Sequence, residues 1–347
     1  MTAISKNRNR EGFRDVHIDR PLTNISIAHF QSTQDFVFPR FFPHIPVQHA
    51  SDTFTVYPQG YFNRIHDTKR GDETAANSIT YDTAKDSYTV DEDALRIFIS
   101  DKKIANADGE RRIVMEATEV VTNAMMVKRE KMFADFFLNT DSTWDMNKTG
   151  TAAGTGTNEF KKWSEAMSDP IGDVRAWKRE IVQKSGGRMP NKMLMTLDVW
   201  HTLLDHPDIL DRIEGGATAG SPAMVTKQLV ASLFEIDEIL VMHSLYNNQT
   251  AEEVQDDEGN VPHTNMFMAE GKLLFGHVPM TYGLMKPVAG CTFMWNRYLP
   301  AGANMGPTTR RYRHGDPGIR GEYIECEMAI AHKVISKDLC IRAKAVI

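Results

Sequence analysis

The pattern of hydrophobic and polar positions divides the chain into segments with different periods. Residues 1–52 are rich in aromatic and aliphatic side chains but follow no helical or strand period, and Pro21, Pro39, Pro43 and Pro46 interrupt any helix. We therefore predict an extended arm. An arm of this kind cannot bury its aromatic groups on itself, so it must lie on the body of its own chain or on a neighbouring subunit. The predicted contacts between subunits in the arm are Phe36, Phe38, Phe41 and Phe42.

Residues 53–90 alternate between apolar and polar side chains in two places. The alternation covers residues 53–57 and then residues 79–83 and 87–90, with a polar connection between them. Alternation with a period of two predicts strands, so we expect an extended loop in the form of a two-stranded projection. An isolated ribbon is only marginally stable in water and needs a partner surface. The predicted contacts between subunits in this loop are Tyr57, Tyr61, Lys69, Arg70 and Tyr81.

Residues 110–138 give the clearest helical pattern in the chain. Two adjoining apolar stripes follow helical spacing without an interrupting glycine or proline, and Asp108 is a suitable N-cap. The first stripe is Ala117, Val120, Ala124 and Val127; the second is Val114, Val121, Met125, Met132 and Phe136. Two stripes indicate a helix that is covered over a wide angle. We predict that residues 91–140 form a domain built on this spine helix.

Residues 141–300 change to alternating helices and strands, which predicts an α/β domain. Asp169 and Pro170 supply an N-cap and a first helical residue, and Gly186 ends that helix. Further helices are expected after Asp198 and after Ser221, and strands at residues 193–197 and 238–242. The tail, residues 301–347, alternates again and is expected to return to the sheet of the 91–140 domain. The fold class is therefore α+β.

Composition narrows the possible classes of protein. The 347 residues are 41% hydrophobic, which suffices for a folded core, and their net charge of -6 disfavours a protein whose main task is binding nucleic acid. Three cysteines without a CxxC pair disfavour a disulfide framework and a zinc ribbon. Residues 1–20 lack the apolar segment of a signal peptide, and no apolar run reaches the length of a membrane helix. We expect a protein folded in a cytoplasm, with no membrane partner.

The motifs of the common enzyme classes are absent from the sequence. It has no phosphate-binding GxxxxGK[ST], no GxGxxG after a strand, no HExxH and no GxSxG. His201, His206, Asp205 and Asp208 resemble a metal cluster superficially, but a solvated helix end explains them better. The acidic run 256–258 lacks the spacing of a calcium loop. We therefore assign no catalytic residue, no cofactor and no metal ligand, and we expect no enzyme.

Two groups of arginines are candidates for contact with phosphates. They lie near the start of the chain and in the glycine-rich stretch 301–321. Salt bridges across subunit contacts, or plain solvation, are the favoured explanation of the same residues, and the sequence leaves contact with phosphates open. The candidates for DNA-facing or inter-subunit charge are Arg8, Arg10, Arg310, Arg311 and Arg313.

Several segments, taken in order, resemble the major capsid proteins of tailed bacteriophages with the Hong Kong 97-type fold. The most specific is the run HPDILDRI at residues 206–213. The others are PLTNIS at 21–26, FFP at 41–43, SDPI at 168–171, LVASLF at 229–234 and CTFMW at 291–295. The resemblance covers nearly the whole chain and lies in the order of the segments rather than in one strict motif.

This resemblance implies a Hong Kong 97-like capsid fold. Its parts would be an N-terminal arm at residues 1–52, an extended loop at 53–90, a peripheral domain with a spine helix at 91–140, an axial α/β domain at 141–300, and a return to the peripheral sheet at 301–347. It also implies a function. Copies of the chain would assemble into hexamers and pentamers of an icosahedral phage head that encloses double-stranded DNA.

The resemblance further implies partners and a location. The chain would bind copies of itself, portal and scaffolding proteins and, as a further candidate, a decoration protein, and would contact packaged DNA only weakly and without sequence specificity. It would be found in the virion capsid after assembly in the cytoplasm of a bacterial host. Some relatives cross-link a lysine of the extended loop to a neighbour. Lys69 and Lys85 lie in the corresponding region, but no carboxylate base is marked in the sequence, so no cross-link is expected.

Two alternatives belong to other functional classes. An encapsulin-like bacterial nanocompartment would have the same fold with a protein cargo inside. An α/β enzyme built on residues 165–300 would need a pocket with convergent titratable groups, which the sequence does not offer, and would leave the arm unexplained. A shell explains both the aromatic arm and the lone ribbon, because each subunit of a closed lattice overlaps the next.

Overall fold

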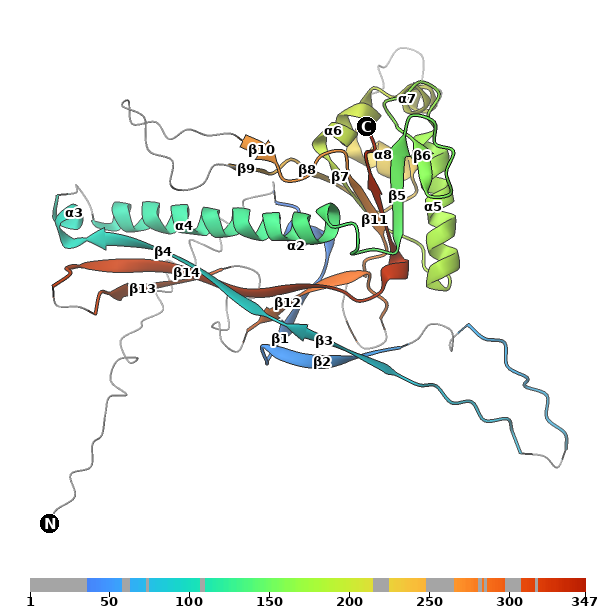
Figure 1. Ribbon diagram of the computed structural model, residues 1–347, viewed down its shortest axis with the longest axis horizontal. Helices are drawn as coiled ribbons and strands as arrows, with labels where there is room; N and C mark the ends of the chain where they lie inside the picture. The colour runs from blue at the N-terminus through green and yellow to red at the C-terminus, as the bar shows by residue number, and fades with distance from the viewer. Residues whose placement is uncertain are drawn as a thin grey trace. The chain divides into compact units, whose positions relative to one another are not determined.

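The computed structural model describes residues 36–57, 63–72, 75–106, 110–214, 225–247, 265–279, 283, 286–296, 307–315 and 318–347. The chain forms two compact units. Among the described residues, unit 1 takes those of Asp91–Lys128 and Trp295–Ile330. Unit 2 contains Asp35–Val90, Arg129–Met294 and Ala331–Ile347. Helices and strands occur in both units, as an α+β fold requires (Figure 1).

Unit 1 packs a long helix on one face of an antiparallel sheet. Its strands are β4 (Asp91–Ser100), β13 (Thr308–Arg313) and β14 (Gly321–Val334), and β14 pairs with both of the others. The short helix α3 (Asp101–Ala105) follows β4. The helix α4 (Glu110–Phe133) contributes Val114 and Ala117 to a core with Ile99 and Ile324. Because side chains alternate across a strand, the neighbours of Ile99 and Ile324 point to the opposite face of the sheet.

The predicted spine helix is present but differs in two details. It continues beyond α4 into a six-residue π-helix, η3 (Ala134–Asn139), so the helical run ends one residue after the predicted position. The second apolar stripe is confirmed in its first part, since Val114, Val121 and Met125 are buried. The first stripe is wrong at Val120, whose side chain is 59% exposed. The proposed N-cap, Asp108, lies outside the described residues.

Unit 2 contains a six-stranded sheet in the order β6-β5-β15-β11-β7-β8. The strands are β5 (Met146–Thr151), β6 (Glu159–Lys161), β7 (Lys192–Thr196), β8 (Glu238–Met242), β11 (Leu273–Gly276) and β15 (Cys340–Lys344). Strand β11 is antiparallel to both of its neighbours, and the pairs β15–β5, β5–β6 and β7–β8 are parallel. The sequence predicted β7 and β8 to within a residue.

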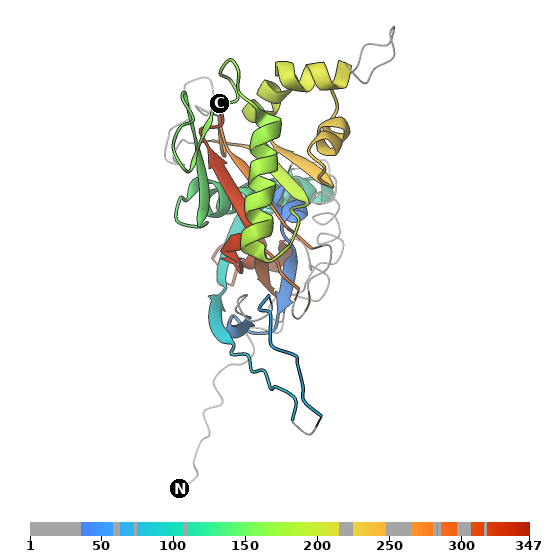
Figure 2. The same cartoon turned by 90° about the vertical axis from the view of Figure 1, so that its right-hand side faces the viewer.

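Four helices accompany this sheet: α5 (Pro170–Ser185), α6 (Leu197–Leu204), α7 (Pro207–Glu214) and α8 (Lys227–Leu233). Helix α5 lies across one face of the sheet in Figure 2 and packs on it through Val174, Trp177 and Ile181. As predicted, Asp169 caps α5 by accepting a hydrogen bond from Gly172 N at 2.7 Å, and the helix ends at Gly186 with φ +72°.

Two predicted helix starts need correction. Helix α6 begins after Thr196, and the side chain of Asp198 instead accepts hydrogen bonds from Val199 N and from Gly271 N, on the loop before β11. Helix α8 begins after Thr226, whose hydroxyl accepts a hydrogen bond from Leu229 N at 3.3 Å. The predicted start at Ser221 lies outside the described residues.

The tail was predicted to return entirely to the sheet of unit 1, and this is wrong for its last part. Residues up to Ile330 belong to unit 1, but β15 lies in the middle of the six-stranded sheet, between β5 and β11. The reason is its burial on both faces: Cys340, Ile341 and Ala343 are buried, as a central strand requires. An alternating pattern in the sequence does not identify which of two sheets a strand joins.

The remaining elements of unit 2 are short. They are α2 (Phe38–Phe41), β1 (His44–Val47), β2 (Ser51–Val56), β3 (Ala84–Thr89), β9 (Leu245–Asn247), β10 (Asn265–Phe267), β12 (Gly290–Trp295) and η4 (Lys337–Leu339). Strands β2 and β3 form a separate antiparallel pair, and so do β9 and β10. Across the described residues, the helices are too short or too polar to span a membrane.

Candidate interaction surfaces

The four phenylalanines predicted to contact a neighbouring subunit are buried inside their own chain. Phe36, Phe38, Phe41 and Phe42 are all in the core of unit 2, so the prediction is wrong for them. The aromatic rings that receive them come from the end of α4 and from η3. The centroid of the Phe42 ring lies 4.6 Å from that of Phe137. These side chains are therefore not available to a partner.

A buried carboxylate holds the backbone of this aromatic segment. Glu130 accepts hydrogen bonds from Val37 N and Phe38 N, both at 2.9 Å, and the guanidinium of Arg129 lies 4.2 Å from the centroid of the Phe38 ring. Burial raises the pKa of Glu130 to about 7, although both backbone donors favour its charged form. Consecutive charged residues in an apolar helix were the only signal for this site in the sequence.

Two histidines border the same segment. The rings of His44 and His332 meet the Phe38 ring edge to face, with centroids at 4.8 and 5.2 Å. Burial, reinforced by the charge of Arg129, lowers the pKa of both histidines to about 3, so they are neutral at ordinary pH. The segment is thus held by neutral rings and one buried acid.

The predicted two-stranded projection is present, and it is exposed. Strands β2 and β3 pair from Ser51 with Thr89 to Val56 with Ala84. The described residues that follow, 63–72 and 75–83, are neither helix nor strand, so the strand predicted at 79–83 is wrong. Figure 1 shows the two sides of this ribbon continuing beyond β2 and β3. We call residues 57–83 the ribbon tip.

The ribbon tip presents apolar side chains to solvent. Ile65 is 98% exposed, Ile79 66% and Tyr81 60%. Among the predicted contact residues, Lys69 and Arg70 are also exposed, Tyr57 is half-buried with its ring near Tyr81, and Tyr61 lies outside the described residues. Most of the surface of Ile65, Ile79 and Tyr81 is therefore left for a partner to cover. The ribbon tip is a candidate interaction surface.

The base of the ribbon, formed by β2 and β3, is anchored by contacts with the rest of unit 2. The Tyr88 ring stacks on Phe293 of β12 with centroids 4.3 Å apart, and Phe54 approaches the same ring at 5.8 Å. Lys333 Nζ lies 3.0 Å from Asp86 Oδ1. The ribbon thus has an anchored base and an exposed tip.

The candidate DNA-facing arginines of β13 are paired with glutamates of β14 in the same chain. Arg310 bonds Glu327 at 3.1 Å, and Arg311 bonds Glu322 at 2.6 Å. Arg313 also approaches Glu322, at 3.5 Å, and its own side chain is exposed. Of the alternatives left open by the sequence, ion pairing is present, although within one chain. Arg8 and Arg10 lie outside the described residues.

The face of this sheet that α4 does not cover carries aromatic rings and charges, including the pair Arg310–Glu327, whereas Arg311 and Glu322 lie on the opposite face. The centroids of Phe98 and Tyr312 lie 5.1 and 5.6 Å from that of Tyr323, and the guanidinium of Arg96 lies 4.5 Å from the Tyr323 ring. The Tyr312 hydroxyl donates a hydrogen bond to Glu325. We call this surface the aromatic face of unit 1. It is a second candidate interaction surface, because α4 packs on the opposite side of the sheet.

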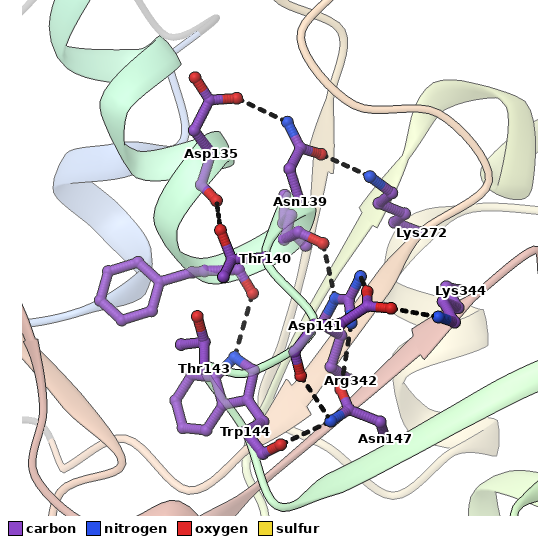
Figure 3. A network of polar contacts seen from close by, with 12 residues as sticks. Asp135, Asn139, Thr140, Asp141, Thr143, Trp144, Asn147, Lys272, Arg342 and Lys344 are labelled. Carbon is purple, nitrogen blue, oxygen red and sulfur yellow. Dashed lines mark hydrogen bonds and ion pairs between the residues drawn. The ribbon is translucent and has the colours of Figure 1, made fainter.

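A polar network connects η3 to the six-stranded sheet (Figure 3). The buried Arg342 of β15 donates hydrogen bonds to Leu138 O at 2.6 Å, to Asn147 Oδ1 at 3.1 Å and to Asp141 Oδ1 at 2.6 Å. Lys344 also bonds Asp141. The hydrogen bonds from these two cations lower the pKa of Asp141 to about 2. Every partner comes from unit 2, so the network makes η3 and the sheet one structural body.

The histidine cluster noted in the sequence has a structural role. His206 is buried, its Nε2 lies 2.9 Å from Ser168 Oγ, and its Nδ1 accepts a hydrogen bond from Asp208 N at the start of α7. Burial lowers the pKa of His206. Within the described residues, no three His, Cys, Asp or Glu side chains are arranged to hold a metal ion. The free cysteines Cys291, Cys326 and Cys340 are buried.

Comparison with known sequences points to one class of protein. Residues 153–262 match the family model described as phage major capsid protein E. The chain is 26% identical to the major capsid protein of Burkholderia phage BcepMu over 232 residues, which are 66% of this chain and 70% of that protein. It is 24% identical, over the same shares of both chains, to the major capsid protein of Pseudomonas phage JBD67.

Comparison with solved structures identifies the fold. A phage-related protein from Bordetella bronchiseptica RB50 superposes with a TM-score of 0.68 at 15% identity, covering 95% of this chain and 98% of that one. The capsid protein of cyanophage P-SCSP1u gives 0.53 at 14% identity, covering 89% and 88%. The mature capsid of bacteriophage PhiM1 gives 0.53 at 11% identity, covering 88% and 86%.

These similarities confirm both the predicted fold and the resemblance. Two of these neighbours are phage capsid structures, and the α+β fold that all three share with this chain extends over most of its length. The family model and the curated relatives are phage major capsid proteins, so the nanocompartment alternative is not favoured.

Proposed function

We propose that this chain, a major capsid protein of a tailed phage, builds the hexamers and pentamers of an icosahedral shell through its exposed ribbon. The observation that carries the proposal is the ribbon tip. When a partner covers an exposed apolar side chain, the contact is stabilised by about 25 cal/mol for each Å² of apolar surface removed from water. Ile65, Ile79 and Tyr81 are exposed on a segment whose described residues form no strand, and a neighbouring copy would cover them.

The contacts that we assign to this surface are the predicted ones that remain accessible. They are Tyr57, Lys69, Arg70 and Tyr81, with Tyr61 proposed from the sequence alone. The four phenylalanines are excluded from the contact set because their own chain covers them. Repetition of one such contact by symmetry would close rings of subunits, since each copy offers one ribbon and receives one.

We further propose that the chain acts mechanically and is not an enzyme. The capsid family is a structural class, which supports this role. Contact with packaged DNA would be weak and non-specific, because Arg310 and Arg311 already pair with carboxylates. Portal and scaffolding proteins are the proposed further partners, with a decoration protein as an additional candidate. The shell would form part of the virion after assembly in the host cytoplasm.

The test is assembly of the purified full-length chain, followed by negative-stain microscopy. A double variant, Ile79→Ser with Tyr81→Ser, removes two exposed apolar side chains of the ribbon tip and leaves Ile65 in place. Met189→Ser is the matched control, because Met189 is 65% exposed at another site in unit 2. We expect closed shells from the unmodified chain and from Met189→Ser, and far fewer from the double variant.

Two results would contradict the proposal. If the unmodified chain stays monomeric, both alone and with its scaffolding protein, the proposal that it builds a shell is contradicted. A double variant that forms shells as readily as Met189→Ser would show that the ribbon tip does not contribute to the contact between subunits. Thermal melting of the unassembled subunits should be the same for all three proteins, because exposed side chains contribute little to stability.

A further inference from the structure

Helix α5 presents a row of arginines to solvent. Its buried side packs on the six-stranded sheet, and Figure 2 shows the helix in front of that sheet. Arg175 and Arg179 are one helical turn apart, so they lie on the same face of the helix. The two guanidinium groups are therefore open to a partner. The residues of α5 that are exposed are Arg175, Ala176, Arg179, Gln183 and Lys184.

Three other charged side chains of α5 are engaged in ion pairs. Lys178 Nζ lies 3.1 Å from Glu235 Oε2. Glu180 binds two cations, with its carboxylate oxygens 2.7 Å from Lys148 Nζ and 2.9 Å from Lys184 Nζ. The helix thus has favourable ion pairs within the subunit, and these pairs leave out both arginines of the row.

The arginines of the row have no counter-charge in the part of the chain that the structure describes. Asp173, the second acid of α5, accepts a hydrogen bond from Trp163 Nε1 at 3.0 Å. Among the described residues, Arg175 and Arg179 form no hydrogen bond or ion pair through their side chains. Arg188, in the turn after α5, adds a third exposed guanidinium of the same kind. The result is a local excess of positive charge on a chain whose net charge is -6.

This row does not serve the fold of the subunit. Like charges one turn apart repel each other and destabilise a helix. The arginines of β13 that the sequence marked as candidates for contact with DNA behave differently, since Arg310 and Arg311 each pair with a glutamate. Arginines that stay unpaired at a cost to their helix favour a negatively charged partner outside the subunit.

The chemistry of this surface suits a nucleic acid better than a protein. Protein interfaces are centred on apolar and aromatic side chains that become buried. The exposed residues of α5 include one apolar side chain, the methyl group of Ala176, and the larger Met189 follows only after Arg188. Interfaces with nucleic acids are polar and positively charged, and arginine is a common ligand of phosphates.

We propose that the exposed side of α5 binds the phosphate backbone of double-stranded DNA, with Arg175 and Arg179 each contacting a phosphate and Arg188 extending the contact. This binding rests on the proposed function, a shell that encloses DNA, and identifies the surface that faces the DNA. Contacts with phosphates carry no sequence information, so the binding is non-specific. Each copy contributes few contacts and binds weakly, and repetition over a shell multiplies them.

The first experiment measures binding of a double-stranded DNA fragment to the unassembled full-length subunit, by fluorescence anisotropy at several salt concentrations. R175Q/R179Q removes two charges from the row. R212Q/K227Q is the matched control, because it removes the same charge from exposed positions of α7 and α8. We expect R175Q/R179Q to weaken binding by about tenfold at low salt and to reduce the slope of log K against log salt by about 1.8, since each phosphate contact contributes about 0.9. The control should keep the slope, and DNA fragments of unrelated sequence should behave alike.

The second experiment compares empty shells with DNA-filled heads built from the unmodified chain. Phenylglyoxal modifies accessible guanidinium groups, and mass spectrometry of peptides reports the modification of each arginine. We expect Arg175 and Arg179 to react in empty shells and to be protected in filled heads, whereas Arg212 should react to the same extent in both. Thermal melting of R175Q/R179Q checks that the variant is folded, because the loss of like charges on an exposed helix face does not destabilise it.

Three results would overturn the assignment of this surface to DNA. The first is a salt slope in R175Q/R179Q equal to that of the control. The second is protection of Arg175 and Arg179 in empty shells as well as in filled heads, which would mean that an acidic surface of another protein subunit covers the row. The third is full reaction of both arginines in filled heads, which would leave the row in solvent. Closed shells of the unmodified chain support the proposed function in all three cases, and a failure to form any shell contradicts that function instead.

Discussion

Two segments of unit 2 carry aromatic and aliphatic side chains close together in the sequence, and the fold treats them in opposite ways. Phe38, Phe41 and Phe42 are buried against Phe133 and Phe137, and Glu130 accepts hydrogen bonds from the backbone of this segment. The ribbon tip leaves Ile65, Ile79 and Tyr81 in solvent. The two segments differ in what lies next to them. The first lies against a helix end rich in aromatic rings, whereas the second extends away from its anchored base.

The comparison shows how a subunit divides its apolar surface between folding and assembly. Side chains that contact their own chain stabilise the subunit before any partner arrives. Side chains on a projecting ribbon contribute nothing until a neighbour covers them. Substitutions in the two segments should therefore separate cleanly in two measurements, the free energy of unfolding and the yield of shells.

The largest effect is expected from Phe42→Ala in the buried segment. Removal of this ring leaves a cavity beside Phe137 and Trp144, and we expect a loss of about 3–5 kcal/mol in the free energy of unfolding. Denaturant titration of the unassembled subunit measures it. Tyr81→Ala is the matched aromatic truncation in the ribbon tip, where a change within about 0.5 kcal/mol is expected. Equal losses in the free energy of unfolding of the two variants would show that the ribbon tip stabilises the subunit as much as the buried segment does.

A smaller effect should appear in the pH dependence of stability through Glu130. Burial raises its pKa from an unfolded value of 4.5 to about 7, so the folded subunit binds this proton more tightly. The contribution is fully present below pH 4.5 and is lost as pH rises to about 7, with a slope of about 1.4 kcal/mol per pH unit. Glu130→Gln should remove that share of the slope in denaturant titrations between pH 5 and 7.

Glu327 has a raised pKa in the same window, so part of the slope will remain in Glu130→Gln. A slope identical to that of the unmodified chain would show that Glu130 does not titrate there. Glu165→Gln is the control for the substitution itself, because the side chain of Glu165 is exposed.

A substitution at the base of the ribbon tests whether β2 and β3 are stabilised independently of the buried phenylalanine segment. Phe293→Leu removes the stacked ring under Tyr88 while keeping most of the apolar volume, and we expect a loss of about 1 kcal/mol. Hydrogen exchange should become faster in β2 and β3, whereas the amides of Val37 and Phe38 should be unaffected. Faster exchange in both segments would mean that they are not independent.

The smallest effect is expected from Asp86→Asn. Its ion pair with Lys333 is partly exposed, so the expected loss is at most about 0.5 kcal/mol and should shrink in high salt. Thermal melting at two salt concentrations measures this difference. A salt-independent loss above about 1 kcal/mol would give the pair a larger part in anchoring the ribbon than its exposure suggests.

Local signals in the sequence were sufficient for many elements but not for the interaction surfaces. Helix α5 was predicted from Asp169, Pro170 and Gly186, and these residues cap it as expected. The projection was predicted from alternation, and β2 and β3 form it. The aromatic face of unit 1 was not predicted. It exists only because β4 and β13 pair with β14 and bring Phe98, Tyr323 and Tyr312 into one row.

Period, capping residues and composition determined by themselves that this chain has a long helix, an α/β region and a projecting ribbon, because those signals act over a few neighbouring residues. The order of segments also carried the resemblance to phage capsid proteins. Only the tertiary structure decided that the side chains of Phe36, Phe38, Phe41 and Phe42 are internal, that β15 joins the six-stranded sheet and that Glu327 lacks a donor for its Oε2 among the described residues. Burial and pairing depend on groups far apart in the chain, and no local pattern encodes which distant partner a side chain will meet.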